Sequence, residues 1–394
     1  MSRNTSIGEL AALGALQFGD GYRTKRSEHG QPGYRIIRVA DVMDDAVSFE
    51  GPDFVSADYV RAIGTKLGHP GDILLTTKGT VGRVAVLPET GEQVVYSPQL
   101  CYFRVLDFDV IAPRFLRYWF SSQEFWLQAA DRMNNTDMAA YINLADIRSL
   151  KMTLPSIHNQ QAIAEVLGAL DDKIAANTTL LATLDSLRRA RFHSMLNKEV
   201  LELPLSGTAE FVNGKAFTKN ASGTGRVVIR IAELNSGLGG STIYNDIEVG
   251  ERHLARPGDI LFAWSGSLTL HRWYRDEGII NQHIFKVIPN AGFPHWLAYE
   301  LIQNKLDAFK SIAADKATTM GHIQRRHLDE PVRVPSERSV KTNNEAMEAL
   351  WKRSLLAERE SLELATTRDA LLPQLMSGKL RVKDAEKLLV EAGV

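Results

Sequence analysis

Residues 69–79 read HPGDILLTTKG, and residues 256–266 read RPGDILFAWSG. The shared phrase is Pro-Gly-Asp-Ile-Leu, which begins at Pro70 in the first stretch and at Pro257 in the second, 187 residues later. Pro-Gly-Asp is typical of a tight turn, and the apolar residues after it are typical of a buried strand. The phrase therefore predicts a scaffold element that the chain uses twice.

Other short matches surround both copies of this phrase and keep the same order along the chain. Thr24-Lys25 returns as Thr218-Lys219, 194 residues on, and the run IRVADV at 37–42 returns as IRIAEL at 229–234. Further along, FRV at 103–105 is matched by FKV at 285–287, and PS at 155–156 by PS at 335–336, 180 residues on. Chance matches would not stay in order while their separation falls steadily. We therefore expect two tandem copies of one module, and not an array of short repeats.

The amino-acid pattern changes after each module. Residues 157–197 contain no proline and one glycine, and apolar or small residues recur from Ile163 to Leu184 in steps of four and three, which is a heptad seam. The second copy has a more polar seam from Met347 to Leu364. Two helices of about 40 residues, each on the order of 60 Å long, are expected. Because the second seam is too polar to associate strongly by itself, we expect the two helices to pair as an antiparallel coiled coil.

Local signals predict where these helices begin and end. Ser156 and Ser336 each follow a proline and are candidate N-caps, and Gly378 is a candidate helix stop. Pro373 interrupts the second pattern, so that helix is expected to kink or end just before it. Asn177 occupies a seam position, where it either fixes the register of the pair or marks a partly exposed seam.

Within each module the pattern mixes strands and helices. Strand-like runs include YRIIRVADV, GDILLTT and LCYFRVL in the first copy, and VVIRIAEL, GDILFAW and NQHIFKVI in the second. Pro113 and Pro294 each begin a helical pattern, in which proline suits the first position. The predicted fold class is therefore mixed α/β (α+β). The predicted domains are a first module at 1–156, a spacer helix at 157–198, a second module at 199–335, a second spacer helix at 336–380 and a tail at 381–394.

The composition is that of a soluble globular protein, with 44% hydrophobic and 24% charged residues. The single cysteine, Cys101, excludes an internal disulfide and fits a reducing cytoplasm, where it is most simply a small core residue. No apolar run approaches the roughly 20 residues of a membrane helix. The net charge of −1 argues against a protein that coats DNA, so any nucleic-acid surface must be a local patch or be shared with a partner.

Catalytic motifs are missing from the sequence. There is no GxxxxGK[ST] phosphate loop, and the chain has no Pro-Pro, which an Asn-Pro-Pro-Tyr type motif of adenine methyltransferases would contain. His322 and His327 are five residues apart without an intervening glutamate, unlike the histidines of a zinc protease. We therefore expect a chain without catalysis and without a metal or cofactor of its own.

The loops that follow the repeated scaffold are polar, and they differ between the copies. Thr-Thr-Lys-Gly after the first Pro-Gly-Asp-Ile-Leu is matched by Ala-Trp-Ser-Gly after the second. Such side chains can contact the phosphates and base edges of DNA, and two modules with different loops would recognise two different base sequences. For any single residue, an ordinary solvated loop is the simpler interpretation. The candidate DNA contacts are Lys25, Arg26, Lys78, Thr80, Arg83, Asn134, Asn135, Lys219, Trp264, Ser265, Ser267, Gln282, His283, Lys316 and Thr318.

This layout resembles the specificity subunit of type I restriction–modification enzymes. The stretch LPSIHNQQAIAEVLGALDDKIAANTTLLATLDSLRRA at 154–190 is similar to the start of that family's spacer helix, and LLPQLMSGKLRV at 371–382 is similar to its ending. The second copy departs from the pattern, because it lacks the Gln-Gln pair and has Trp351 in place of the aspartate. The matching residues of the first copy are Pro155, Gln160, Ile163, Ala164, Leu167, Leu170 and Asp171.

The resemblance implies a division of labour between this chain and its partners. Each module would be a target recognition domain that binds one half of a bipartite double-stranded DNA site. The paired helices would set the gap between the halves and dock two methyltransferase subunits. Those subunits would hold S-adenosylmethionine, and restriction subunits would use ATP and Mg for translocation and cleavage. This chain would be cytoplasmic, without membrane contact, and would direct DNA methylation and defence against foreign DNA.

Alternatives from other functional classes stay open at this point. A coiled-coil scaffold or adaptor without sequence-specific DNA binding would show the same helices. The recognition part of a fused type II-like system would need a methyltransferase motif on the same chain. A mimic that inhibits restriction should be strongly acidic, which the net charge of −1 argues against.

Overall fold

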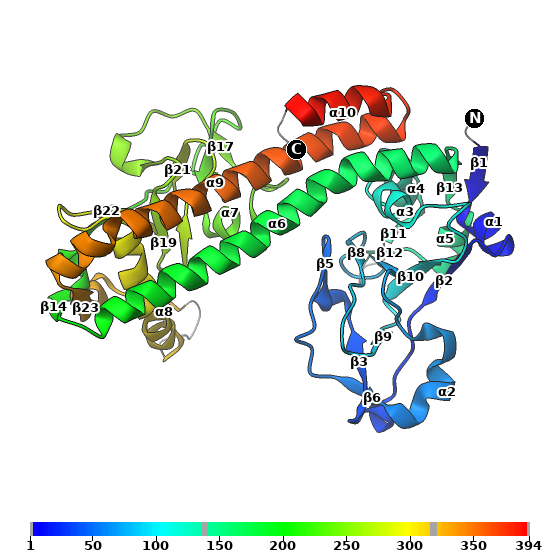
Figure 1. The fold of residues 1–394 in the computed structure, drawn as a ribbon, viewed down its shortest axis with the longest axis horizontal. Helices are drawn as coiled ribbons and strands as arrows, with labels where there is room; N and C mark the ends of the chain where they lie inside the picture. Colours follow the sequence, from blue (N-terminus) through cyan, green and yellow to red (C-terminus); the bar gives the residue numbers. More distant parts are fainter. Residues whose placement is uncertain (1–2, 136–139, 316–320, 392–394) are drawn as a thin grey trace. The chain divides into compact units, whose positions relative to one another are not determined.

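The computed structural model describes residues 3–135, 140–315 and 321–391. The chain divides into two compact units, of which unit 1 is Met1–Asp172 with Ala365–Val394 and unit 2 is Lys173–Leu364. Two long helices, α6 (Ile157–Leu196) and α9 (Glu337–Met376), are shared between the units, while the modules belong to one unit each (Figure 1).

The module of unit 1 is built from small sheets. Its central sheet is antiparallel and has the strand order β2-β10-β7-β8, and a second sheet has the order β6-β3-β9. Three two-stranded ladders, β1-β13, β4-β5 and β11-β12, complete it. The strands are β1 (Arg3–Ser6), β2 (Leu16–Asp20), β3 (Gly33–Ile37), β4 (Val42–Met43), β5 (Ala46–Val47), β6 (Phe54–Ser56), β7 (Ile73–Thr76), β8 (Val84–Val86), β9 (Val94–Tyr96), β10 (Leu100–Val105), β11 (Asn134–Asn135), β12 (Ala140–Tyr141) and β13 (Lys151–Leu154).

Short helices cover this module. They are α1 (Ile7–Ala12), α2 (Val60–Ile63), α3 (Pro113–Trp119), α4 (Gln123–Arg132) and α5 (Leu144–Ser149). Proline begins α3, as the sequence predicts. Phe120 and Phe125 pack edge to face, with ring centroids 5.2 Å apart, and both rings contact Trp119. These fully buried rings fix the helices on the central sheet.

The module of unit 2 repeats the same architecture. Its sheets have the orders β15-β22-β19-β20 and β17-β16-β21-β18, and β14 pairs with β23. The strands are β14 (Val200–Pro204), β15 (Ala209–Asn213), β16 (Arg226–Ile229), β17 (Tyr244–Asn245), β18 (Leu254–Ala255), β19 (Ile260–Ala263), β20 (Thr269–Arg272), β21 (Gly278–Ile280), β22 (Ile284–Pro289) and β23 (Pro331–Pro335). The helices are α7 (Ile231–Ser236) and α8 (His295–Asp315). Since the sheets β2-β10-β7-β8 and β15-β22-β19-β20 share one topology and each module closes by pairing its first strand with its last, the duplication predicted from sequence is confirmed.

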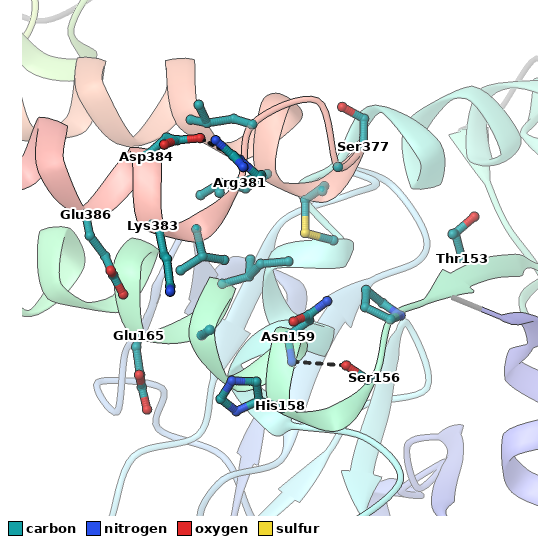
Figure 2. Close-up of a pocket in the computed structure, with 18 of the residues that line it drawn as sticks. Thr153, Ser156, His158, Asn159, Glu165, Ser377, Arg381, Lys383, Asp384 and Glu386 are labelled. Atoms are coloured by element: carbon teal, nitrogen blue, oxygen red, sulfur yellow. Dashed lines mark hydrogen bonds and ion pairs between the residues drawn. The ribbon is translucent and has the colours of Figure 1, made fainter. Parts of the chain in front are cut away.

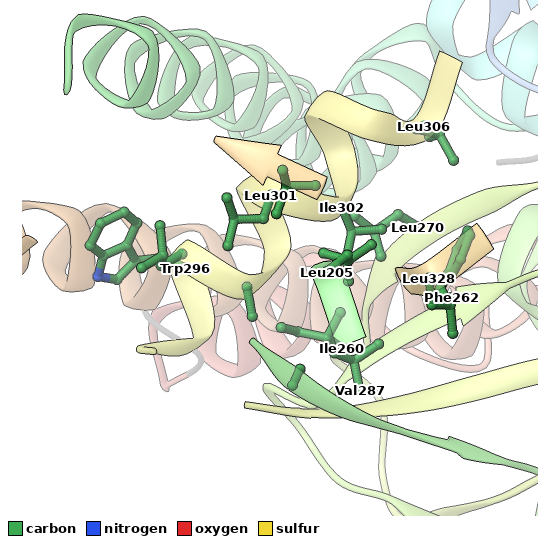
Figure 3. Packing of buried hydrophobic residues seen from close by; sticks show 14 of the residues in the cluster. Leu205, Ile260, Phe262, Leu270, Val287, Trp296, Leu301, Ile302, Leu306 and Leu328 are labelled. Atoms are coloured by element: carbon green, nitrogen blue, oxygen red, sulfur yellow. The ribbon is translucent and has the colours of Figure 1, made fainter. Parts of the chain in front are cut away.

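A single hydrophobic core joins α8 to the central sheet of unit 2 (Figure 3). Trp296 is fully buried and donates its indole N–H to the Asn344 Oδ1 atom at 2.9 Å, which satisfies the one polar group that the ring brings inside. Full burial of a large apolar side chain is worth roughly 1.5–3 kcal/mol. The core includes Leu205, Ile260, Phe262, Leu270, Val287, Leu301, Ile302, Leu306 and Leu328.

Two of the predicted strand-like runs are shorter in the structure than in the sequence pattern. β16 ends at Ile229, and the rest of the run VVIRIAEL forms helix α7. The cause is local, because Glu233 accepts hydrogen bonds from both the backbone N–H and the guanidinium of Arg230. In the first copy Asp41 accepts from the backbone N–H of Arg38 at 2.7 Å. Strand β3 likewise ends at Ile37 and is followed by a 3-10 turn (Val39–Asp41). An acidic side chain three residues on therefore ends the strand in both modules.

The strand register corrects one of the sequence matches. Ile73 of the first Pro-Gly-Asp-Ile-Leu lies opposite Phe103, whereas Ile260 of the second lies opposite Val287. If Phe103 is matched with Phe285, as in the sequence, β22 is shifted by two residues against β19 compared with β10 against β7. A shift of two keeps every side chain on its own face of the sheet, so the alternation in the sequence could not reveal it.

The long helices run antiparallel, as predicted. In unit 1 the start of α6 lies beside the end of α9, where Arg368 pairs with Asp171 at 2.7 Å. In unit 2 the Asn177 amide donates to the Glu360 carboxylate at 2.9 Å. Asn177 is only 3% exposed, so it is a buried seam residue with a specific partner and not the mark of an exposed seam.

The helix ends follow the local signals, with one exception. The side-chain oxygens of Ser156 and Ser336 each accept from the backbone N–H three residues on, and Gly378 has a φ of +69° just beyond α9. Pro373 does not end α9, which continues to Met376. The segment expected as a tail contains helix α10 (Val382–Glu391), which with the start of α6 and the end of α9 lines a cavity of about 790 Å³ (Figure 2).

Candidate nucleic-acid interface

The aspartate of each Pro-Gly-Asp-Ile-Leu phrase ties the turn to the middle of the sheet. Asp72 is 1% exposed, and both of its oxygens accept from the Arg104 guanidinium at 2.7 Å. It also accepts from the Tyr96 hydroxyl at 2.7 Å and from the backbone N–H of His69 at 2.9 Å. Burial and the Asp72 charge both raise the pKa of Tyr96, which therefore stays a neutral donor.

The second copy uses the same design with a different cation. Asp259 pairs with the Lys286 ammonium at 2.8 Å and accepts from the backbone N–H of Arg256 at 2.7 Å. Lys286 also donates to the Leu254 carbonyl, just as Arg104 donates to the Leu67 carbonyl in the first copy. The repeated phrase is therefore scaffold, and it fixes the position from which the following loop leaves the sheet.

That loop is held by the same backbone hydrogen bonds in both modules. We call residues 77–83 turn 1 and residues 264–268 turn 2. In turn 1 the Gly79 N–H donates to the Ala140 carbonyl at 3.1 Å; in turn 2 the Gly266 N–H donates to the Gly321 carbonyl at 2.8 Å. A second bond returns from Ile142 to turn 1 and from Ile323 to turn 2. The two turns therefore share one pattern of backbone hydrogen bonds and differ in their side chains.

Turn 1 presents polar groups at the end of β7. Lys78 and Thr80 are exposed, and Lys78 bridges to Tyr141 on β12. Lys78 and Tyr141 also line a cavity of about 290 Å³ together with Asp20. Arg83 is half-buried, and its guanidinium donates to the Val42 carbonyl at 3.3 Å.

Turn 2 presents an aromatic surface instead. The Trp264 ring is half-buried, donates its N–H to Asn213 Oδ1 at 2.8 Å, and lies 5.2 Å from the His283 ring and 6.3 Å from the His322 ring between centroids. Ser267 is exposed, but Ser265 is only 7% exposed, so the structure does not leave the Ser265 side chain on the surface.

Residues 282–283 lie beside turn 2, and the loop that begins at Lys215 lies next to them. Gln282 and His283 are exposed, and the His283 carbonyl accepts from the Trp264 backbone N–H at 3.1 Å. The Gln282 N–H donates to the Lys215 carbonyl at 2.9 Å, which brings Lys215 to the same edge. Lys219 is exposed further along the loop that begins there.

Among the remaining predicted residues, Lys25 and Arg26 do not lie at turn 1. Lys25 and Arg26 are exposed on a short 3-10 turn (Arg26–Glu28) next to His29, which bridges to β6 of the second sheet and not to the central sheet that carries turn 1. Asn134 and Asn135 form β11, which pairs with β12 at Tyr141, but their side chains lie outside the described part of the chain. Lys316 and Thr318 lie outside the described residues.

The structure adds residues that were not predicted from the sequence. Tyr141 and His322 occupy equivalent positions, since Lys78 bridges to Tyr141 and Ser265 bridges to His322. Asn213 and Lys215 join them in unit 2 through contacts with Trp264 and Gln282. The falling separation of the repeats could have pointed from Tyr141 to His322, but no feature of the sequence marks either residue as polar surface.

Neither a metal centre nor a membrane span is found in the part of the chain that the structure describes. Its His, Cys, Asp and Glu side chains form no group of three that could hold a metal ion. None of its helices is long and apolar enough to cross a membrane. Cys101 is buried and unpaired, and burial raises the pKa of its thiol, which fits a core residue and not a reactive one.

The sequence is similar to a known protein family and to one curated relative. Residues 4–186 match the family described as the type I restriction modification DNA specificity domain. The type I restriction enzyme MjaVIII specificity subunit of Methanocaldococcus jannaschii is 26% identical over 158 residues, which are 38% of this chain and 36% of that protein. The matched stretch thus spans only about a third of this curated relative.

One solved structure extends the likeness in fold to both modules. The crystal structure of the S subunit of a type I restriction–modification system from M. genitalium aligns with 95% of this chain and 96% of its own, at a TM-score of 0.57 and 14% identity. The HsdS subunit from Thermoanaerobacter tengcongensis aligns with 96% of this chain and 97% of its own, at a TM-score of 0.37 and 13% identity. The first module and most of α6 thus match the type I restriction modification DNA specificity domain, and both modules share their fold with a solved S subunit of a type I restriction–modification system.

Proposed function

We propose that this chain recognises DNA for a type I restriction–modification complex, with each module binding one half of a bipartite double-stranded site. The observation that carries the proposal is the pair of equivalent turns. Identical backbone hydrogen bonds hold Lys78 with Tyr141 in one module and Ser265 with His322 in the other. A constant frame with exchanged side chains is what two related binding modules need in order to recognise different base sequences.

The side chains at the turns suit contacts with DNA in different ways. Lys78 is an exposed cation on a loop and suits a phosphate, whereas Tyr141 and His322 have hydrogen-bonding groups that suit base edges. Trp264, flanked by two histidine rings, offers an apolar face for a sugar or a thymine methyl group.

The chemistry of the complex is assigned to its other subunits. Two methyltransferase subunits dock on the pair of long helices and hold S-adenosylmethionine, while restriction subunits use ATP and Mg for translocation and cleavage. This chain supplies no catalytic group, and the complex works in the cytoplasm. The match of residues 4–186 to the specificity-domain family and the missing methyltransferase and phosphate-loop motifs support this division.

A matched pair of variants tests the proposal. Tyr141→Ala and His322→Ala are each introduced into the complex with its methyltransferase subunits, and methylated sites are mapped in host DNA. Loss of a base contact costs about 1–3 kcal/mol of discrimination at one position. We expect Tyr141→Ala to relax one half of the site and His322→Ala to relax the other, so that each variant is the control for its counterpart.

Two results would contradict the proposal. If both variants relaxed both halves of the site, the modules would not bind their halves independently. If the purified chain alone methylated DNA when supplied with S-adenosylmethionine, the assignment of the chemistry to partner subunits would be wrong.

A further inference from the structure

A cluster of charged side chains in unit 1 joins the long helices to the neighbourhood of turn 1. Asp171 of α6 pairs with Arg368 of α9 at 2.7 Å and accepts from the Tyr118 hydroxyl of α3. Arg368 also lies 3.7 Å from the carboxylate of Asp45, which pairs in addition with Arg117 of α3. Asp45 is therefore the one residue of this cluster that belongs to the β4-β5 hairpin.

Burial makes the cluster sensitive to the loss of a carboxylate. The Arg117 side chain is 12% exposed, and burial lowers its pKa, which means that its charge is maintained against a desolvation cost. Burial, reinforced by the hydrogen bond to Asp171, raises the pKa of Tyr118. The cluster thus needs its carboxylates to hold the cations of α3 and α9 in place.

The β4-β5 hairpin connects this cluster with turn 1. The backbone N–H of Asp45 donates to the Val84 carbonyl at 2.9 Å, directly after turn 1. The Val42 carbonyl at the other end of the hairpin accepts from the Arg83 guanidinium at 3.3 Å. A cavity of about 260 Å³ has both Gly82 of turn 1 and Arg368 of α9 in its wall.

We propose that Asp45 is a positioning residue, through which the pair of long helices sets the orientation of Arg83 at the DNA-binding surface of the first module. The inference rests on the proposed function and deepens it. Helix pairing places Arg368 and Asp171, these place Asp45, and the hairpin that carries Asp45 supplies the carbonyl that holds Arg83. Assembly of the helices is thereby coupled to recognition of one half-site.

The backbone conformation at Asp45 allows a substitution that removes the charge and keeps the turn. Asp45 has a φ of +63°, a left-handed conformation that asparagine adopts as readily as aspartate. Asp45→Asn therefore removes the charge and keeps the turn. Glu210→Gln is the matched control, because it removes one exposed carboxylate from an ion pair with Arg252 in unit 2.

A double-mutant cycle tests the inference in the complete complex with its methyltransferase subunits. DNA binding is measured on the parent site and on sites with one half changed, for Asp45→Asn, Arg83→Ala and the double variant. Asp45 is partly exposed, so we expect Asp45→Asn to weaken discrimination at one half-site by about two- to five-fold. In the Arg83→Ala background it should have no further effect, and Glu210→Gln should leave that half-site unchanged.

The outcomes separate this inference from the proposed function. Equal effects of Asp45→Asn with and without Arg83, or no effect at all in a parent complex that does recognise a bipartite site, would overturn the positioning role alone. Loss of discrimination at both halves would show a general defect of the fold and would overturn it too. A parent complex that recognises no bipartite site would overturn both proposals.

Discussion

At the scale of single residues, one carboxylate in each module fixes the turn that leads into the central sheet. Asp72 is the more deeply buried of the two, since its side chain is 1% exposed and that of Asp259 is 21% exposed. Asp72 also has more partners, because it accepts hydrogen bonds from two nitrogens of a guanidinium and from a tyrosine hydroxyl. The two copies of one sequence phrase should therefore differ in how much stability their aspartates contribute.

We predict that Asp72→Asn is more destabilising than Asp259→Asn. Removal of one partner of a buried ion pair costs about 3–5 kcal/mol, because the other charge stays buried without compensation. The cost at Asp259 should be smaller, since water can reach this carboxylate. Hydrogen exchange of peptides that contain β7 and β19 reports the opening free energy of each module separately. Equal costs, or a larger cost in unit 2, would contradict the prediction.

At the scale of elements, the same positions of the two long helices hold their modules by different chemistry. Asp171 of α6 receives the Tyr118 hydroxyl, whereas Trp351 of α9 packs edge to face on Tyr299 with ring centroids 5.3 Å apart. Trp351 also lies under the Arg272 guanidinium, 4.6 Å from it. The departure of the second copy from the family pattern at Trp351 is thus explained by an aromatic and cationic anchor in place of an acidic one.

We predict that the helix pair acts as a spacer, provided that both helices change together. Asn177 binds Glu360, so four residues inserted after Asn177 must be matched by four inserted just before Glu360. Four residues add about 6 Å and slightly more than one turn, which nearly restores the facing of both seams. The gap between the half-sites should lengthen by one or two base pairs, at about 3.4 Å per base pair.

Methylation mapping of this variant beside the parent provides the measurement. Matched insertions of two residues are the control, because they rotate the seams by about 200° and should prevent assembly of the complex. An active four-residue variant with an unchanged gap would leave the helices as a docking surface only.

At the scale of the whole molecule, each module is a closed structure that can be exchanged. Its first and last strands pair with each other, so β14 and β23 bring both ends of the second module together. Unit 2 also contains a buried anchor, in which Arg188 of α6 pairs with Glu300 of α8 and lies 4.8 Å from the Tyr299 ring. An exchanged module must keep these partners, because an unpaired buried Arg188 would be costly.

We predict that exchange of residues 200–335 for the matching module of a related subunit changes one half of the recognised site. The donor should have a glutamate at the position of Glu300, and a donor without it serves as the control that should fail to assemble. The measurement is again methylation mapping in the host. A well-assembled chimera with both half-sites altered would show that the modules do not act separately.

Much of this architecture was predictable because its signals are local. Proline and glycine mark turns and helix ends wherever they occur, so the caps at Ser156 and Ser336 and the stop at Gly378 could be located without a structure. The order of repeated phrases revealed the duplication, and the heptad seam revealed the helix pair. Pro373 was expected to kink or end the helix, and of these two alternatives the structure excludes the end, since α9 continues past it to Met376.

The sequence by itself thus determined the elements, their duplication and the family pattern, because these depend on spacing along the chain. Only the tertiary structure decided which loops meet. Lys78 meets Tyr141 and Ser265 meets His322 across more than fifty residues, whereas Lys25 and Arg26 lie beside a different sheet. Such pairings depend on strand register and on which faces pack together, and a register shift of two residues leaves the alternation of side chains unchanged. The surface proposed to contact DNA is therefore a property of packing, while the scaffold beneath it is a property of the local sequence.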